Sequence, residues 1–324
     1  APRLAQSTGY IFLTLNGGSV ENKGMELSIT GKPIVTRDFQ WETTLNLSGN
    51  RGRLGDFIDG VDIFYVTDAQ IGAAKAGSIP NGGYFLGLTG NKYETAQGPD
   101  GKMYNVIDAS TGLYKDTQVE TNIVGNREPK LIGGFNNSFS YKNFNLSFLF
   151  DIRLGGDIYN GTEYYLVTKG LSTKTINRES VSFTGVVNTG TAAKPSYETK
   201  TITYNANETY QVGNSTRSGK YMIQEYYKNY AKNAYNFITD TNWLRLRSIS
   251  LSYDFKDLLK KQNIIKGLTA TITGTNLFVW TNYKGMDPET CVSGSGTGGS
   301  GSAGIDYCGV PATAGMSFGI NLTF

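Results

Sequence analysis

The chain has 324 residues, a formal net charge of +3 and only 18% charged residues, which is too weak a charge to favour nucleic-acid binding. Histidine is absent, so the commonest general base and metal ligand is missing. No apolar run reaches the roughly 20 residues that a membrane helix needs. These features argue against a nucleic-acid-binding protein, a histidine-dependent enzyme and a helical membrane protein.

The first predicted strands show strict alternation of apolar and polar residues. Residues 23 to 30 alternate in this way, and after a predicted turn at 31 to 38 the alternation resumes over residues 39 to 48. The second run places one set of large side chains on a single face: Phe39, Trp41, Leu45 and Leu47. A period of two predicts β-strands with one apolar and one polar face. Residues 10 to 15 are either a short strand or part of an ordered outer loop.

Residues 130 to 141 and 144 to 154 form a predicted hairpin around the tight connection Tyr141-Lys142-Asn143. The apolar face of its second strand carries Phe144, Leu146, Phe148, Phe150 and Ile152. One end of the hairpin turns within a few residues, whereas the other opens into segments of dozens. This asymmetry is typical of an outer-membrane barrel, which has short periplasmic turns and long outer loops.

Three further strands are predicted at 243 to 255, 268 to 280 and 316 to 324. In the first, the alternation changes phase near Arg245 and Arg247, which indicates either a position above the lipid or a β-bulge. A short basic turn at 256 to 266 is predicted to hold one helical turn. The last strand ends on an aromatic residue and is the most regular.

The predicted strands are separated by long outer loops at about 51–129, 155–241 and 281–315. They lack a sustained period and contain turn sequences rich in glycine and proline. Loops of this length would count against a compact domain, but they are expected on the outer face of a barrel. The predicted fold is therefore all-β, an antiparallel transmembrane barrel of which about seven strands are present.

Five sequence blocks, spread from residue 22 onward, carry a family resemblance. They are Asn22–Leu27, Gly125–Phe144, Leu244–Tyr253, Gly274–Phe278 and Tyr283–Glu289. In this order they resemble the C-terminal part of the SusC/RagA family of TonB-dependent outer-membrane transporters of Bacteroidetes. The signal peptide, the TonB box, the plug and the early strands of that family have no counterpart in this sequence.

The resemblance implies import of oligomeric nutrients, oligosaccharides or peptides, across the bacterial outer membrane. It implies a SusD-like lipoprotein lid, energy from TonB acting through a plug, and no cofactor or catalytic residue. A plugged barrel has about 22 strands, so seven strands would leave two open edges, which lipid does not tolerate. We therefore expect a companion chain or segment that carries the plug and the earlier strands. The alternative is a passive structural or adhesive barrel.

Five tyrosines between residues 221 and 235 form the main candidate contact site: Tyr221, Tyr226, Tyr227, Tyr230 and Tyr235. One interpretation is a stacking surface that contacts substrate or the lid. The other is a long loop that packs on its own aromatic residues. The sequence leaves both open.

Cys291 and Cys308 are the only cysteines and lie in one loop, so a disulfide that closes this loop is expected. Asp287 and Glu289 have either a structural role or a role in calcium binding; no metal site is predicted. On the last strand, one face is expected to act both as a lipid-facing girdle and as the signal for barrel assembly, through Phe318, Ile320, Leu322 and Phe324.

Overall fold

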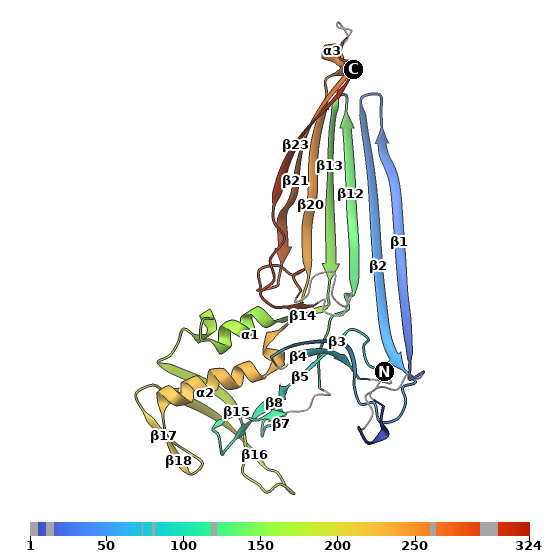
Figure 1. Ribbon diagram of the computed structural model, residues 1–324. Coiled ribbons are helices and arrows are strands. Elements are labelled where there is room, and N and C mark those ends of the chain that lie inside the picture. Colours follow the sequence, from blue (N-terminus) through green and yellow to red (C-terminus); the bar gives the residue numbers. More distant parts are fainter. Residues whose placement is uncertain are drawn as a thin grey trace.

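The computed structural model describes residues 6–10, 16–72, 74–79, 82–117, 122–259, 264–291 and 304–324. Figure 1 shows a tall, curved sheet with a second part at one of its ends. We term this second part the loop body; it consists of the described residues within 56–130, 155–242 and 282–314. The possible strand at residues 10 to 15 falls largely outside the described residues.

Seven antiparallel strands form the tall sheet, in the order β1-β2-β12-β13-β20-β21-β23. Their bounds are β1 (Ser19–Val35), β2 (Phe39–Gly55), β12 (Leu131–Tyr141), β13 (Phe144–Leu154), β20 (Trp243–Asp254), β21 (Gly267–Thr281) and β23 (Gly315–Thr323). All seven overlap predicted strands, but β1 and β2 are longer than the predicted 23 to 30 and 39 to 48, and β2 runs into the segment predicted as the first outer loop. The turn expected at residues 31 to 38 is shorter than predicted, because an irregularity between Gly31 and Ile34 lets β1 continue to Val35.

The pairing registers bring the apolar residues of neighbouring strands opposite one another. Phe135 pairs with Leu45 of β2 and with Phe150 of β13, and Ile272 of β21 pairs with Phe318 of β23. One face of the sheet is therefore apolar from edge to edge. Phe318 is 76% exposed, so this face has no protein partner among the described residues. An exposed apolar face of this extent indicates contact with a membrane or another apolar partner.

Short polar side chains hydrogen-bond across the opposite face of the sheet. Ser28 donates to Asn46 at 2.7 Å, and the hydroxyls of Ser250 and Thr273 lie 2.8 Å apart. On the apolar face, Asn137 is an exception, because its amide oxygen accepts a hydrogen bond from the indole N–H of Trp41 at 3.0 Å. This bond satisfies a polar group that would otherwise meet an apolar surrounding.

A β-bulge at Arg247 explains the change of phase in β20. The register with β13 shifts between Phe150 and Leu149, which face Leu246 and Ser248 of β20. The bulge returns Leu246 to the apolar face while Arg245 and Arg247 reach the polar face, where both form ion pairs. Of the two alternatives left open by the sequence, the bulge is the one observed.

The loop body contains shorter elements that the period of the sequence does not reveal. Its strands are β3 (Phe64–Ile71), β4 (Ala74–Ser78), β5 (Gly87–Gly90), β6 (Lys92–Tyr93), β7 (Thr95–Gln97), β8 (Met103–Asp108), β9 (Leu113–Tyr114), β10 (Asp116–Thr117), β11 (Ile123–Asn126), β14 (Asp157–Asn160), β15 (Ser180–Asn188), β16 (Tyr197–Asn205), β17 (Thr209–Val212), β18 (Ser215–Ser218), β19 (Ile238–Asp240) and β22 (Ile305–Asp306).

Two helices, α1 (Gly161–Thr168) and α2 (Gly219–Lys232), lie side by side in the loop body (Figure 1). The 3-10 turns are η1 (Gln6–Thr8), η2 (Thr173–Thr175) and η3 (Ala234–Phe237), and α3 (Lys256–Leu259) is the helical turn predicted at the other end of the sheet. No helix in the described ranges is long and apolar enough to span a membrane.

Two large apolar cores and a smaller cluster of Ala96, Val106 and Val186 hold the loop body together. One gathers Tyr159, Val167, Phe237 and Ile305 with residues of β4, β5 and β11. The other packs Met222 and Ile223 of α2 against β15 and β16. The connections between the barrel strands are thus folded structures with interiors of their own, and they gather at one end of the sheet (Figure 1).

Candidate functional site

The polar face of the sheet carries a cluster of ion pairs where it meets the loop body. Arg245 of β20 donates to Asp287 at 2.6 Å, with both side chains almost fully buried. Arg247 bridges Asp151 of β13 and Glu289. The second oxygen of Asp287 accepts the backbone N–H of Ala312 at 2.9 Å. These contacts fix the third long connection against the wall.

The same contacts bear on the role of Asp287 and Glu289. Both carboxylates are neutralised by arginine, and no group of three potential ligands that could hold a metal ion occurs among the described residues. Of the two roles considered for this pair, the arrangement supports the structural one. Arginine suits it because its fork of N–H donors can bind two carboxylates at once.

A hollow of about 690 Å³ lies beside this cluster and is lined by five neighbouring strands, from β1 to β20 in sheet order, together with Glu289. Gly134 of β12 leaves room on the side of Asp151, and Asp151, Arg153 and Trp243 contribute polar groups. Asp151 and Arg153 lie on the polar face of β13, opposite to the face that carries Phe150 and Ile152. The hollow therefore has a mixed lining, in which a few charged and polar groups stand among apolar side chains.

A buried carboxylate ties the third connection to α1. Asp306 of β22 accepts hydrogen bonds from the hydroxyls of Tyr283, at 2.7 Å, and Thr162, at 3.2 Å. Burial raises the pKa of Asp306 above its ordinary value, although both hydrogen bonds oppose the shift. Nothing in the local sequence identifies this site, because its members are separated by as many as 144 residues.

Some of the five candidate tyrosines pack against other aromatic rings, and the others are exposed to solvent. Tyr226 stacks on Phe183 with ring centroids 5.2 Å apart, and burial raises the pKa of Tyr226 to about 12. Tyr230 packs edge-on against Phe237. By contrast, Tyr221 and Tyr235 are 40% and 61% exposed. Within this set the structure brings together Tyr226, Tyr227 and Tyr230, which line one groove of about 400 Å³.

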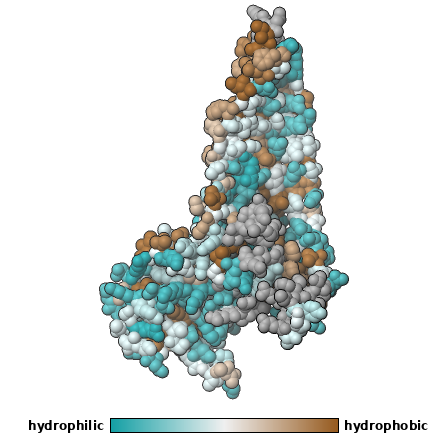
Figure 2. All heavy atoms as spheres, in the orientation of Figure 1, coloured by the Kyte–Doolittle hydropathy of each residue, from teal (hydrophilic) through white to brown (hydrophobic). Residues whose placement is uncertain are grey.

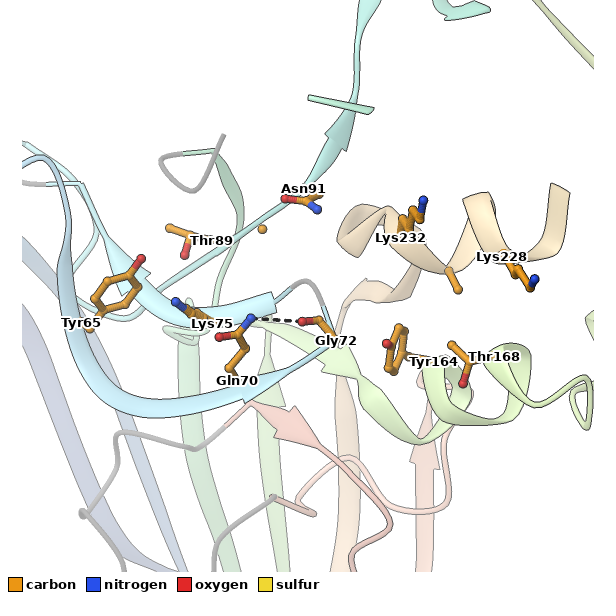
Figure 3. A pocket seen from close by; sticks show the side chains of 12 residues that line it. Tyr65, Gln70, Gly72, Lys75, Thr89, Asn91, Tyr164, Thr168, Lys228 and Lys232 are labelled. Carbon is orange, nitrogen blue, oxygen red and sulfur yellow. Dashed lines mark hydrogen bonds between the residues drawn. The ribbon is translucent and has the colours of Figure 1, made fainter. Parts of the chain in front are cut away.

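A second hollow, of about 540 Å³, was not found by sequence reasoning. Figure 3 shows Tyr65 and Lys75 on one side, and Lys228 and Lys232 of α2 on the other. Tyr164 of α1 also lines it (Figure 3). The only local signal was the spacing of four residues between two lysines in a helical stretch, which puts them on one helix face.

The predicted disulfide and the predicted assembly signal on the last strand remain predictions. Within the described residues, Cys291 is half-buried and Cys308 is exposed. The disulfide between them stays a prediction, which mass measurement of an oxidised sample would test. On β23, the residues expected to form the assembly signal lie on the exposed apolar face: Phe318, Ile320, Leu322 and Phe324.

No protein-family model matches the chain. Known proteins do match it over 99% of its length: "TonB-dependent receptor P3" of Formosa agariphila is 25% identical over 338 residues, and "TonB-dependent receptor P26" of the same organism is 27% identical. The chain is homologous to part of the TonB-dependent receptors. "TonB-dependent receptor SusC" of Bacteroides thetaiotaomicron is 26% identical over 96% of the chain, so the predicted SusC-type resemblance is confirmed.

The match covers only part of each TonB-dependent receptor. The chain spans 30% of the P3 receptor and 27% of SusC. Among solved structures, the RagAB peptide transporter superposes with a TM-score of 0.58 at 18% identity, covering 99% of this chain and 31% of that one. At this identity the likeness shows the fold alone, and it confirms the predicted all-β, partial receptor barrel.

Proposed function

We propose that this protein forms part of the wall and outer loops of a TonB-dependent importer in the bacterial outer membrane. The observation that carries the proposal is the two-faced sheet, which is apolar on one side and polar on the other across all seven strands. Lipid on one side and a watery or plugged lumen on the other account for both faces. No catalytic role is part of the proposal.

The partners follow from the open sheet. β1 and β23 each pair with one neighbour in the described sheet, and an unpaired edge is unfavourable in lipid. We propose that strands of a companion chain or segment close the barrel, and that its plug receives energy from TonB. We also propose a SusD-like lipoprotein as the lid over the loop body, because the resemblance to SusC implies one.

The proposed cargo is an oligosaccharide or a peptide, and the proposed contact surface is the groove with Tyr226, Tyr227 and Tyr230. Asn177 and Lys174 supply polar groups beside these rings. Flat aromatic faces next to hydrogen-bonding groups suit a large, partly polar oligomer. Tyr221 and Tyr235 are the exposed tyrosines that we propose for contact with the lid.

Mild detergent extraction followed by mass spectrometry tests the assembly, and uptake assays in cells with and without TonB test the energy coupling. We expect a plug-bearing companion and a lipoprotein to co-purify, and uptake to require TonB. A passive structural barrel would instead purify without a plug, and TonB would make no difference to uptake. That result would replace the importer with the passive barrel.

A further inference from the structure

Two hollows in the loop body adjoin at two shared lining residues and together make a groove along two helices. The hollow of Figure 3, about 540 Å³, and a second one of about 470 Å³ share Thr168 of α1 and Lys228 of α2. The groove therefore follows the seam between the two helices. We term it the basic groove, after the cationic side chains that line it: Lys75, Lys169, Arg178, Lys220, Lys228 and Lys232.

The charge of the basic groove is strongly one-sided. Among the described residues that line it, Glu179 is the only acidic one. Lys228 has a partner in Glu225, at 2.8 Å, but Glu225 lies outside the lining. Lys220 and Lys232 form no ion pair within the described ranges. A concave surface lined by one sign of charge raises the local concentration of ligands of the opposite charge.

Helix α2 arranges three of these lysines in a row. Lys220, Gln224, Lys228 and Lys232 follow at intervals of four residues, so they lie on one face of the helix. At about 1.5 Å per residue the row is roughly 18 Å long. Like charges four residues apart, as at Lys228 and Lys232, destabilise an isolated helix. An elongated anionic ligand bound along this face would neutralise the lysines and relieve their repulsion.

We propose that the basic groove binds a linear glycan that carries sulfate or phosphate esters. Five of the six cations are lysines, whose ammonium groups are compact point charges that bind phosphate-like oxyanions without requiring a fixed bidentate geometry. Tyr65 and Tyr164 add ring faces to the wall. The helices on either side have internally bonded backbones, so this part of the groove offers no strand edge to an extended acidic peptide.

The test uses the protein purified in detergent with its companion chains, and a heparin-derived hexasaccharide as the probe. The double variant Lys220→Glu/Lys232→Glu is expected to bind it about tenfold more weakly. The control Lys194→Glu/Lys200→Glu changes the net charge equally at exposed positions outside the groove and is expected to bind like the parent. Equal loss in both variants, or no loss in the first, would overturn the proposal.

Two further probes define the ligand class. The desulfated hexasaccharide should bind at least about tenfold more weakly than the sulfated one, and a polyglutamate peptide should not compete with it. Competition by that peptide, or equal binding of the desulfated sugar, would contradict a sulfated or phosphorylated glycan. Binding of this glycan to the basic groove does not depend on the proposed function. Only its role as the cargo of the importer rests on that function. Binding without TonB-dependent uptake would refute the importer alone, and uptake without binding would refute the groove alone.

Discussion

The sheet and the loop body use the same kinds of residue in opposite ways. In the sheet, the side chains of Phe318 and Ile320 lie on the apolar face and are 76% and 74% exposed. In the loop body, Tyr159 and Phe237 are almost fully buried, in a core that strands and helices enclose. Figure 2 shows hydrophobic residues on the surface of the upper sheet and a mostly hydrophilic surface over much of the loop body.

In the proposed importer, this contrast matches two surroundings, lipid around the sheet and water around the loop body. A strand between lipid and lumen needs only a period of two, because each face meets a different medium. A segment surrounded by water must instead collect its aromatic residues from distant positions. The predictions below separate the two regions, beginning with the largest expected effect.

The largest effect is expected for Phe237→Ala, which removes a ring that packs against Tyr159, Tyr164 and Tyr230. Loss of a buried aromatic side chain costs about 3–5 kcal/mol. Limited proteolysis should cut the loop body of this variant while the sheet stays protected. Tyr235→Ala, at a 61% exposed position, is the control and should be cut like the parent. Simultaneous loss of the sheet would show that the two regions do not fold separately.

Arg245→Ala tests the junction between the regions. It leaves the buried Asp287 without its arginine, which is expected to lower stability by about 3–5 kcal/mol. Thermal unfolding in detergent would measure the loss, and the double variant with Asp287→Ala should recover part of it. The exposed pair Lys32–Glu42, at 3.4 Å, is the control, because Lys32→Ala should cost only about 0–1 kcal/mol. Equal effects at both sites would contradict the proposed role of burial.

Phe318→Lys tests which face of the sheet meets lipid. A lysine on the lipid side of a barrel costs about 2–4 kcal/mol near the bilayer midplane, whereas Ser317→Lys would place the charge on the polar face. The folded fraction can be read from heat-dependent migration in gel electrophoresis after reconstitution. If Ser317→Lys is the more damaging change, the two faces have been assigned the wrong way round.

The smallest effect is expected at Asp306. Because burial raises its pKa in the folded state, the charged form is disfavoured there, and stability should increase as the pH falls through the folded pKa. Asp306→Asn keeps an acceptor for Tyr283 and should remove this pH dependence, with a change of about 1 kcal/mol or less at neutral pH. Unfolding curves from neutral to mildly acidic pH would measure it. An unchanged pH profile would assign the dependence to other groups.

Local periodicity explains why the sheet could be predicted and the loop body could not. All seven strands, the faces of their side chains and the bulge near Arg247 are visible as a period of two and one break in it. The loop body depends on pairings between distant segments, such as the parallel pairing of β8 with β15. The basic groove combines Lys75 with Lys228 in the same way. Only the row of lysines on α2 was present in the local sequence.

The pairing of β22 with β14 has a consequence for biogenesis. Ile305 completes a core that begins with Ala74, and Asp306 hydrogen-bonds Thr162. Contacts so far apart along the chain form late and slowly, because a long loop must close before they contribute. The loop body therefore cannot reach its final state until the end of the chain has been delivered. In the outer-membrane importer proposed above, the loop body would stay incompletely folded during secretion, which is compatible with passage through a narrow translocation pore.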